Sequence, residues 1–180
     1  MKLSLPLLAS ALAAVLAQPA AAEGVASLTA ESFATAESDN DWKPLAVLYK
    51  SAGSTAVDAV FAELAEKSAD MFKFAEVDTD AEKALAEAEG WNGETHVKVY
   101  VRPEAKEGKR EGEWLEVDDD TDMKALYGML TDVLPNYVTV IDTAPNLQKF
   151  VQSYKQTLPK VFLFSKKPEP TALYKAMSAE

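Results

Sequence analysis

Residues 44–50 read Pro-Leu-Ala-Val-Leu-Tyr-Lys, and the fold prediction starts from them. The apolar run from Leu45 to Tyr49 is unbroken, which is typical of a strand buried on both faces of a sheet. Residues 51–55 follow as a loop of small and hydroxyl residues. Beyond the loop, apolar residues recur at the spacing of one helix face: Val57, Val60, Phe61 and Leu64. A buried strand followed by an amphipathic helix indicates an α/β protein.

Strand-like and helix-like segments alternate along the rest of the first two thirds of the chain. Further strands are predicted over residues 25–30, 72–77, 96–101 and 113–117. Further helices are predicted over residues 30–38 and 81–89, and over a last segment that carries Met123, Leu126, Leu130 and Val133. The order β-α-β-α-β-α-β-β-α predicts an α/β sandwich with a mixed central sheet.

The C-terminal third repeats the opening of this pattern. Residues 159–165, Pro-Lys-Val-Phe-Leu-Phe-Ser, align with residues 44–50 at an offset of 115. The strand-like residues 137–141 likewise match the first predicted strand. Residues 134–180 are therefore expected to hold the first β-α-β-α elements of a second unit. Half a unit cannot cover its own central strand, so we expect either a fragment of a longer protein or a truncated relative.

The N-terminus has the layout of a secretory signal peptide. Lys2 precedes an apolar stretch over residues 3–16, and Ala20-Ala21-Ala22 offers a cleavage site. The apolar stretch is shorter than the roughly 20 residues that span a bilayer. We therefore expect a signal peptide over residues 1–22 and a first domain over residues 23–133. The mature protein is expected in the endoplasmic reticulum lumen or outside the cell, without membrane insertion.

Composition excludes several classes of function. Eighteen Lys and Arg against 29 Asp and Glu give a net charge of −11, which argues against nucleic-acid and anionic-membrane partners. The chain has no cysteine, which removes thiol nucleophiles, disulfides and cysteine-based metal sites. A single histidine, His96, leaves no multi-histidine metal centre. No metal and no cofactor are predicted.

Several segments together resemble the thioredoxin-like modules of protein disulfide isomerases. The resemblance lies in the order and spacing of weak motifs: Leu28–Phe33, Lys43–Tyr49, Phe72–Asp78, Ala84–Gly90 and Gly93–Tyr100. It covers residues 24–133 and, in partial form, residues 134–180. The resemblance implies a thioredoxin-like fold, a central mixed sheet flanked by helices, followed by the first half of a second such unit.

Both parts of that family's redox apparatus are missing. The family's Cys-x-x-Cys position is occupied by Ser51-Ala52-Gly53-Ser54, or by residues 53–56 if no gap is allowed. The family's cis-proline loop aligns with Glu94-Thr95-His96, with Thr95 at the proline. A cis bond before a residue other than proline costs about 2.5–4 kcal/mol, so a trans loop is expected. A chain without sulfur nucleophiles cannot perform dithiol–disulfide exchange, and we expect no enzyme activity of that kind.

Two further features of the sequence have both a chemical and a structural interpretation. Ser51 and Ser54 could act as nucleophiles with His96 as base, but serines before an apolar helix face are ordinary caps. The acidic clusters at residues 78–82 and 118–122 invite a calcium interpretation. Lys83 occupies the place where a calcium loop needs glycine, and both clusters precede helices, so capping is favoured.

The prediction is a redox-inactive thioredoxin-like domain that binds or scaffolds polypeptides. Its partners would be polypeptide clients or other secretory-pathway folding factors. A client groove is expected beside Tyr49 and Trp91, between residues 51–55 and residues 94–96. The alternative is a structural spacer or fragment of a longer disulfide isomerase or J-domain co-chaperone. A third hypothesis is a secreted acidic protein with weak calcium binding.

Overall fold

The computed structural model describes residues 24–38, 43–51, 53, 56–101, 111–153 and 160–178. The expected signal peptide and two residues of the expected redox-centre position, Ala52 and Ser54, lie outside the described residues. Five strands form one sheet within them: β1 (Val25–Ser27), β2 (Leu45–Lys50), β3 (Lys73–Asp78), β4 (His96–Val101) and β5 (Glu111–Glu116).

The sheet is mixed, as predicted. Its strand order is β1-β3-β2-β4-β5, with β1, β3 and β2 parallel. Strand β4 pairs antiparallel with β2, and β5 pairs antiparallel with β4. The central position of β2 explains its unbroken apolar run, because residues from Leu45 to Tyr49 are at most 3% exposed.

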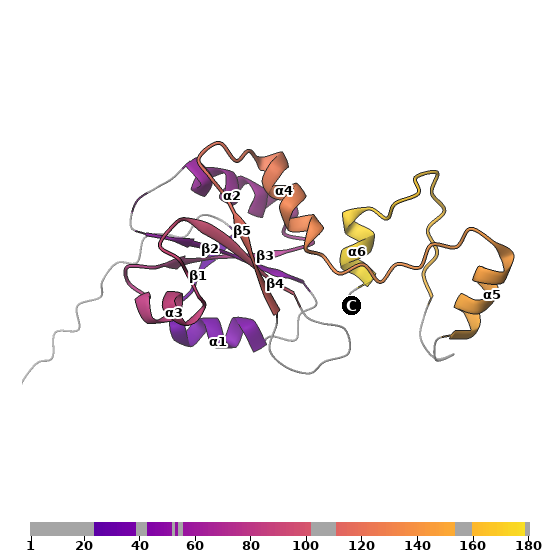
Figure 1. Cartoon of the computed structure of the whole chain (residues 1–180), viewed down its shortest axis with the longest axis horizontal. Coiled ribbons are helices and arrows are strands. Elements are labelled where there is room, and N and C mark those ends of the chain that lie inside the picture. Colours follow the sequence, from indigo (N-terminus) through magenta and orange to yellow (C-terminus); the bar gives the residue numbers. More distant parts are fainter. Residues whose placement is uncertain are drawn as a thin grey trace, which may run out of the picture.

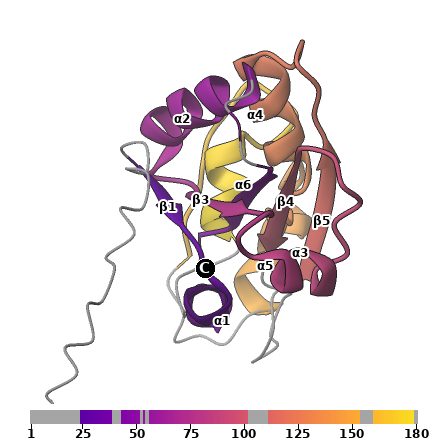
Figure 2. The ribbon, with the colours of Figure 1, turned by 90° about the vertical axis from the view of Figure 1, so that its left-hand side faces the viewer.

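Helices cover both faces of the sheet. Figures 1 and 2 show α2 (Ala56–Ser68) and α4 (Met123–Asp132) on one face, and α1 (Ala30–Ser38) and α3 (Lys83–Ala88) on the other. Two apolar clusters fill the layers between helices and sheet. One gathers Phe61, Phe74, Leu126 and their neighbours under α2 and α4. The other gathers Phe33, Tyr49, Leu85, Tyr100 and their neighbours over α1 and α3.

The two acidic clusters cap the elements that follow them. Asp78 Oδ1 accepts hydrogen bonds from the backbone N–H groups of Asp80 and Ala81, at 3.0 and 3.2 Å. Asp122 is the N-cap of α4, and its Oδ1 accepts from the backbone N–H of Ala125 at 2.7 Å. Each bond satisfies a donor that a helix or turn leaves unpaired at its start. The predicted helix-capping role is therefore confirmed for Asp122. Asp78 instead closes the turn before α3, whose N-cap is Glu82 and which has no side-chain cap bond.

The expected second unit is present only in part. Residues 134–178 form α5 (Ala144–Ser153) and α6 (Ala172–Ser178), near the two expected helices. The prediction of strands over 137–141 and 160–164 is wrong, since the backbone there is irregular in the described residues. A strand is stable only beside a partner strand, and these segments have none among the described residues. The local sequence pattern predicts an extended backbone, but it does not show whether a partner strand lies beside it.

The C-terminal segment contacts the sheet domain through α6. Ala176 is 1% exposed and packs into the cluster under α2 and α4, and Ser178 Oγ accepts from the backbone N–H of Tyr137 at 3.2 Å. Helix α5 lies farther from the sheet (Figure 1). None of the described helices is both long and apolar enough to cross a membrane.

Candidate functional site

The predicted redox-centre position and the predicted cis-proline loop lie at the same end of the sheet. Strand β2 ends at Lys50 and runs into Ser51 and Gly53, while β4 begins at His96. The antiparallel register places Tyr49 opposite His96, so the residues after β2 lie beside those that precede β4. Helix α2 begins immediately after, at Ala56. The fold therefore brings together the two segments that the sequence singled out.

Residues 91–96 are held in shape by their own hydrogen bonds. The indole Nε1 of Trp91 donates to the backbone oxygen of Glu94 at 2.5 Å, and the backbone N–H of Glu94 donates to Asn92 Oδ1 at 3.1 Å. Gly93 adopts φ +103°, a conformation that side chains disfavour. The expected trans loop is confirmed, because no peptide bond in the described residues is cis. This is a shaped surface loop, with Asn92, Gly93 and Glu94 exposed.

His96 is buried at the base of this loop. Its ring is 9% exposed, and Nε2 lies 3.0 Å from Asn92 Nδ2 and 3.6 Å from Glu94 Oε2. Because Asn92 Oδ1 accepts from Glu94, the Asn92 amide nitrogen faces His96 and donates to Nε2. That bond assigns the proton to Nδ1, which has no hydrogen-bond partner in the described part of the chain.

The geometry does not support His96 as a catalytic base. Nε2 already accepts from Asn92, and no hydrogen bond joins His96 to Ser51 within the described residues. Ser54, the second candidate nucleophile, lies outside them. Ser51 is exposed at the end of β2, and no hydrogen bond joins its hydroxyl to a base among the described side chains.

Tyr49 does not line a client groove, which corrects the sequence prediction. Its side chain is fully buried, and its hydroxyl lies 2.7 Å from that of Tyr100. Burial raises the pKa of both phenols, and their mutual contact and the nearby charge of Glu89 also act on the pKa of each. A residue sealed between sheet and helix cannot touch a client. Trp91 is half-buried, so part of its ring remains available at the rim of the site.

Tyr49 belongs to a buried polar network that sequence reasoning missed. The Tyr100 hydroxyl donates to Glu89 Oε2 at 2.9 Å, and Lys98 Nζ donates to Glu89 Oε2 at 2.9 Å and to the Glu89 backbone oxygen at 2.8 Å. The network ties the end of α3 to β4, just before the 91–96 loop. The sequence does contain a sign of this network. Every second residue of β4 has a polar end: His96, Lys98 and Tyr100.

An ion-pair cluster borders the site. Lys50 Nζ lies 3.0 Å from Glu76 Oε2 and 3.4 Å from Asp58 Oδ2, linking β2, β3 and α2. Burial by itself lowers the pKa of Lys50, but the hydrogen bonds and charges of Glu76 and Asp58 outweigh it and raise the pKa. These ion pairs hold Lys50, the last residue of β2, immediately before Ser51.

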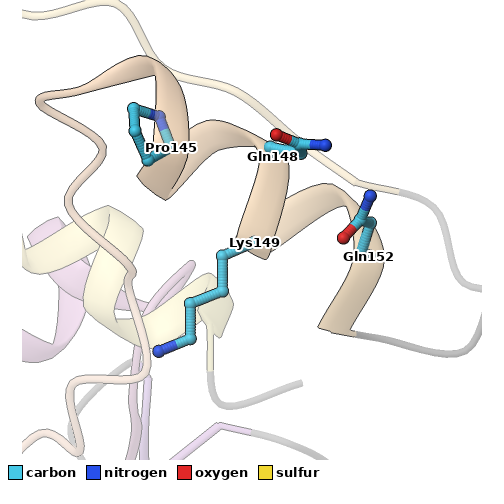
Figure 3. Close-up of a pocket in the computed structure, with 4 residues that line it drawn as sticks. All are labelled: Pro145, Gln148, Lys149 and Gln152. Carbon is cyan, nitrogen blue, oxygen red and sulfur yellow. The ribbon is translucent and has the colours of Figure 1, made fainter.

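A surface depression of about 440 Å³ lies elsewhere, on α5. It is lined by Pro145, Gln148, Lys149 and Gln152, which all project from one helix (Figure 3). None of the predicted site residues borders it. In the described residues no group of three or more His, Asp or Glu side chains is placed to hold a metal ion.

Several solved structures are similar to this chain in fold. No family model matches the chain, and no curated protein matches its sequence. The J-Trx1 fragment of ERdj5 is similar, with a TM-score of 0.52 and 14% identity over 67% of this chain and 54% of that chain. ERdj5 form II is similar, with a TM-score of 0.54 and 17% identity over 72% of this chain. The fold is thioredoxin-like.

A single-domain protein supports the same assignment. Chloroplastic thioredoxin z matches with a TM-score of 0.50 and 14% identity, over 60% of this chain and 92% of that chain. By contrast, the chain spans only 17% of ERdj5 form II. On the thioredoxin-like fold, the structure places Ser51 and Gly53 at the end of β2, beside the loop that ends at His96.

Proposed function

We propose that this chain is a redox-inactive thioredoxin-like module of the secretory pathway, related to protein disulfide isomerases, that binds or positions polypeptides. One observation carries the proposal. The two segments that frame the redox centre in the family it resembles lie side by side here, yet Ser51 and Gly53 stand where sulfur would be needed and the chain has no cysteine. The two segments that would surround a redox centre are therefore present, but the cysteines that would perform the redox reaction are absent.

The surface around this frame suits an extended polypeptide. A Cβ atom added at Gly53 or Gly93 would meet no described atom within 4 Å, so within the described part of the chain the main chain at both positions is open to a close approach. The half-buried ring of Trp91 adds an apolar surface at the rim, and aromatic rings are favoured anchors in recognition. Exposed Asn92 and Glu94 add polar groups that can contact peptide amides.

The cellular compartment is proposed on the N-terminal sequence. Residues 1–22 combine a basic start, an apolar stretch and small residues before Glu23, which favours export through the secretory pathway. The lysine- and acid-rich sequence that follows contains no second stretch of that kind. Fractionation of cells that express a C-terminally tagged chain, with N-terminal sequencing of the product, tests both the compartment and cleavage after Ala22.

Binding is tested with a fluorescein-labelled, cysteine-free unfolded polypeptide and fluorescence anisotropy. The Trp91→Ala variant is expected to weaken binding about tenfold, because truncating an aromatic anchor of a contact surface costs on the order of that factor. Tyr127→Ala is the matched control, since Tyr127 is also half-buried but lies on α4, across the sheet. Its affinity is expected to stay within about twofold of the parent.

Circular dichroism of both variants verifies that they remain folded. No binding by the parent chain, or equal losses in the two variants, would contradict the proposed site. An insulin-reduction assay addresses the redox part of the proposal, for which no turnover above background is expected.

A second candidate role is that of a spacer within a longer disulfide isomerase or J-domain co-chaperone. It is favoured by the apolar residues that 134–178 leaves exposed, including Phe164 at 94%. The mass of the intact protein from its native source tests it. A mass well above that of residues 23–180, with a Cys-x-x-Cys sequence or a J-domain in the additional part, would favour the spacer role.

A further inference from the structure

Residues 160–167, Lys-Val-Phe-Leu-Phe-Ser-Lys-Lys, form an exposed apolar segment flanked by lysines. Four consecutive large apolar side chains are open to solvent there: Val161 at 68%, Phe162 at 44%, Leu163 at 47% and Phe164 at 94%. The corresponding residues of β2 are at most 3% exposed. A soluble domain rarely leaves such a run uncovered unless it is an interaction site.

The backbone of this segment is also unpaired. No backbone–backbone hydrogen bond joins residues 160–166 to any other described residue. The segment contacts α5 through two side chains: Lys160 Nζ donates to the backbone oxygen of Val151 at 2.5 Å, and the Phe162 ring packs edge-on against Phe150 at 5.5 Å. Phe164 and Val161 make no such contact and point into solvent. A run of Val, Phe and Leu with open backbone groups is suited to adding to the edge of a sheet.

The sheet offers one edge of matching length. Strand β5 is terminal in the strand order and has six residues, whereas the other edge, β1, has three. The sequence of β5 is Glu-Gly-Glu-Trp-Leu-Glu, and the side chains of Glu113 and Glu116 are exposed on opposite faces of the strand. The β5 edge is therefore acidic, whereas residues 160–167 carry lysines at both ends.

Residues 134–180 and residues 23–133 also carry net charges of opposite sign. Residues 134–180 carry six lysines against three acidic residues, whereas residues 23–133 carry 11 Lys and Arg against 26 Asp and Glu. Opposite charge favours an encounter between these two parts and fixes the register of their contact. The segment does not lie on β5 of its own chain, because it extends beyond α6, away from that strand (Figure 1).

We propose that residues 160–165 add as a strand to the β5 edge of a second copy of this chain. The lysines at 160, 166 and 167 then lie beside the glutamates of β5, and the four apolar side chains are covered at the contact. Because each copy has one segment and one edge, two copies can exchange segments and close a symmetric dimer.

Sedimentation velocity of residues 23–180 at increasing protein concentration tests this proposal. A reversible dimer that weakens with added salt is expected. Phe164→Asp is expected to weaken the dimer at least about tenfold, because it places a charge on the covered surface. The substitution does not disturb the fold, since Phe164 is 94% exposed in one chain. Lys149→Glu on α5 is the control and should leave the association constant within about twofold.

A charge exchange identifies the edge. Lys166→Glu with Lys167→Glu, or Glu113→Lys with Glu116→Lys, should each weaken the dimer, and combining the four should restore the association constant to within about threefold of the parent. Failure of the combined variant to restore it would overturn the assignment to β5. A chain that stays monomeric at all concentrations overturns the proposal, including one that sediments with anionic phosphatidylserine vesicles, in which case the segment is a membrane contact.

Discussion

Lys98 is a cation on β4 that is almost completely withdrawn from water. It is 8% exposed, donates to both the backbone oxygen and the carboxylate of Glu89, and lies 4.9 Å from the centre of the Trp114 ring. A buried charge persists only where a partner charge and hydrogen bonds replace water. Glu89 supplies both, so the end of α3 depends on this one carboxylate.

Replacing Glu89 by Gln tests that dependence. The substitution leaves Lys98 buried with only a neutral partner and should lower the free energy of unfolding by about 3 kcal/mol. Glu87→Gln is the matched control on the same helix, because Glu87 is 67% exposed and its ion pair with Lys83 is at the surface. The control should change stability by less than about 0.5 kcal/mol. Urea unfolding gives both values, and similar losses would show that the Lys98 pair has no special weight.

The two buried phenols predict how stability changes at alkaline pH. The pKa of Tyr49 and of Tyr100 is raised in the folded chain, first by burial. Below about pH 10 both phenols are protonated in the folded and unfolded states, so they add no pH dependence. Above that pH the unfolded chain loses protons that the folded chain retains, and stability should therefore fall as pH rises.

Tyr49→Phe removes one of the two groups and should make this decline less steep. Urea unfolding between pH 8 and pH 11 measures the slope for the parent and the variant. An unchanged slope would mean that Tyr49 does not contribute to the alkaline loss of stability.

At the scale of elements, β5 packs against β4 because Gly112 has no side chain. A Cβ at Gly112 would lie 2.6 Å from Lys98 Cε and 2.9 Å from a Tyr100 ring carbon, closer than packed atoms approach. Gly112→Ala should therefore cost about 1–3 kcal/mol of unfolding free energy. Gly128 in α4 is the contrasting site, since a Cβ there would meet nothing within 4 Å. Gly128→Ala should stabilise the chain by about 0.5–1 kcal/mol.

Thermal unfolding of these two glycine variants gives the comparison directly. Opposite shifts of the midpoint are expected. A midpoint for Gly112→Ala that is unchanged or higher would contradict the close approach of Lys98 and Tyr100 to this position.

The sequence predicted elements where local pattern and tertiary partners agree. The apolar run of residues 45–49 and the alternation of residues 96–101 both became strands of the sheet. Residues 160–164 carry the same kind of run but have no neighbouring strand among the described residues, and they remain irregular. The pairing of a strand is a property of the whole sheet, which a local pattern does not contain.

The candidate site was predictable in its position but not in its side chains. The resemblance to thioredoxin-like modules predicted that residues 51–54 and 94–96 would lie near one another, and the register of β2 and β4 agrees for the described residues Ser51 and Gly53. The sequence did not predict the burial of Tyr49, because the residues of its network are distant in sequence. They are Tyr100 on β4 and Glu89 at the end of α3. Whether an aromatic residue next to a loop faces solvent depends on such long-range contacts.

At the scale of the whole molecule, the chain combines an acidic thioredoxin-like domain with a basic C-terminal segment. The domain belongs to a chain without cysteine, and the segment keeps apolar side chains exposed. The proposed polypeptide site at the loops and the proposed association through residues 160–165 involve different surfaces. Variants at Trp91 and Phe164 are therefore expected to separate the two properties, each affecting one and leaving the other within about twofold.

Amide and indole chemical shifts of the ¹⁵N-labelled chain, residues 23–180, test polypeptide binding at the loops most directly. On titration with a cysteine-free unfolded polypeptide, shifts should concentrate at the backbone N–H groups of Ser51, Gly53 and Glu94 and at the Trp91 indole. These groups lie at the one end of the sheet where β2 ends and β4 begins. Shifts confined to β5 or to residues 160–167, or no shifts at saturating polypeptide, would contradict a binding site where β2 ends and β4 begins.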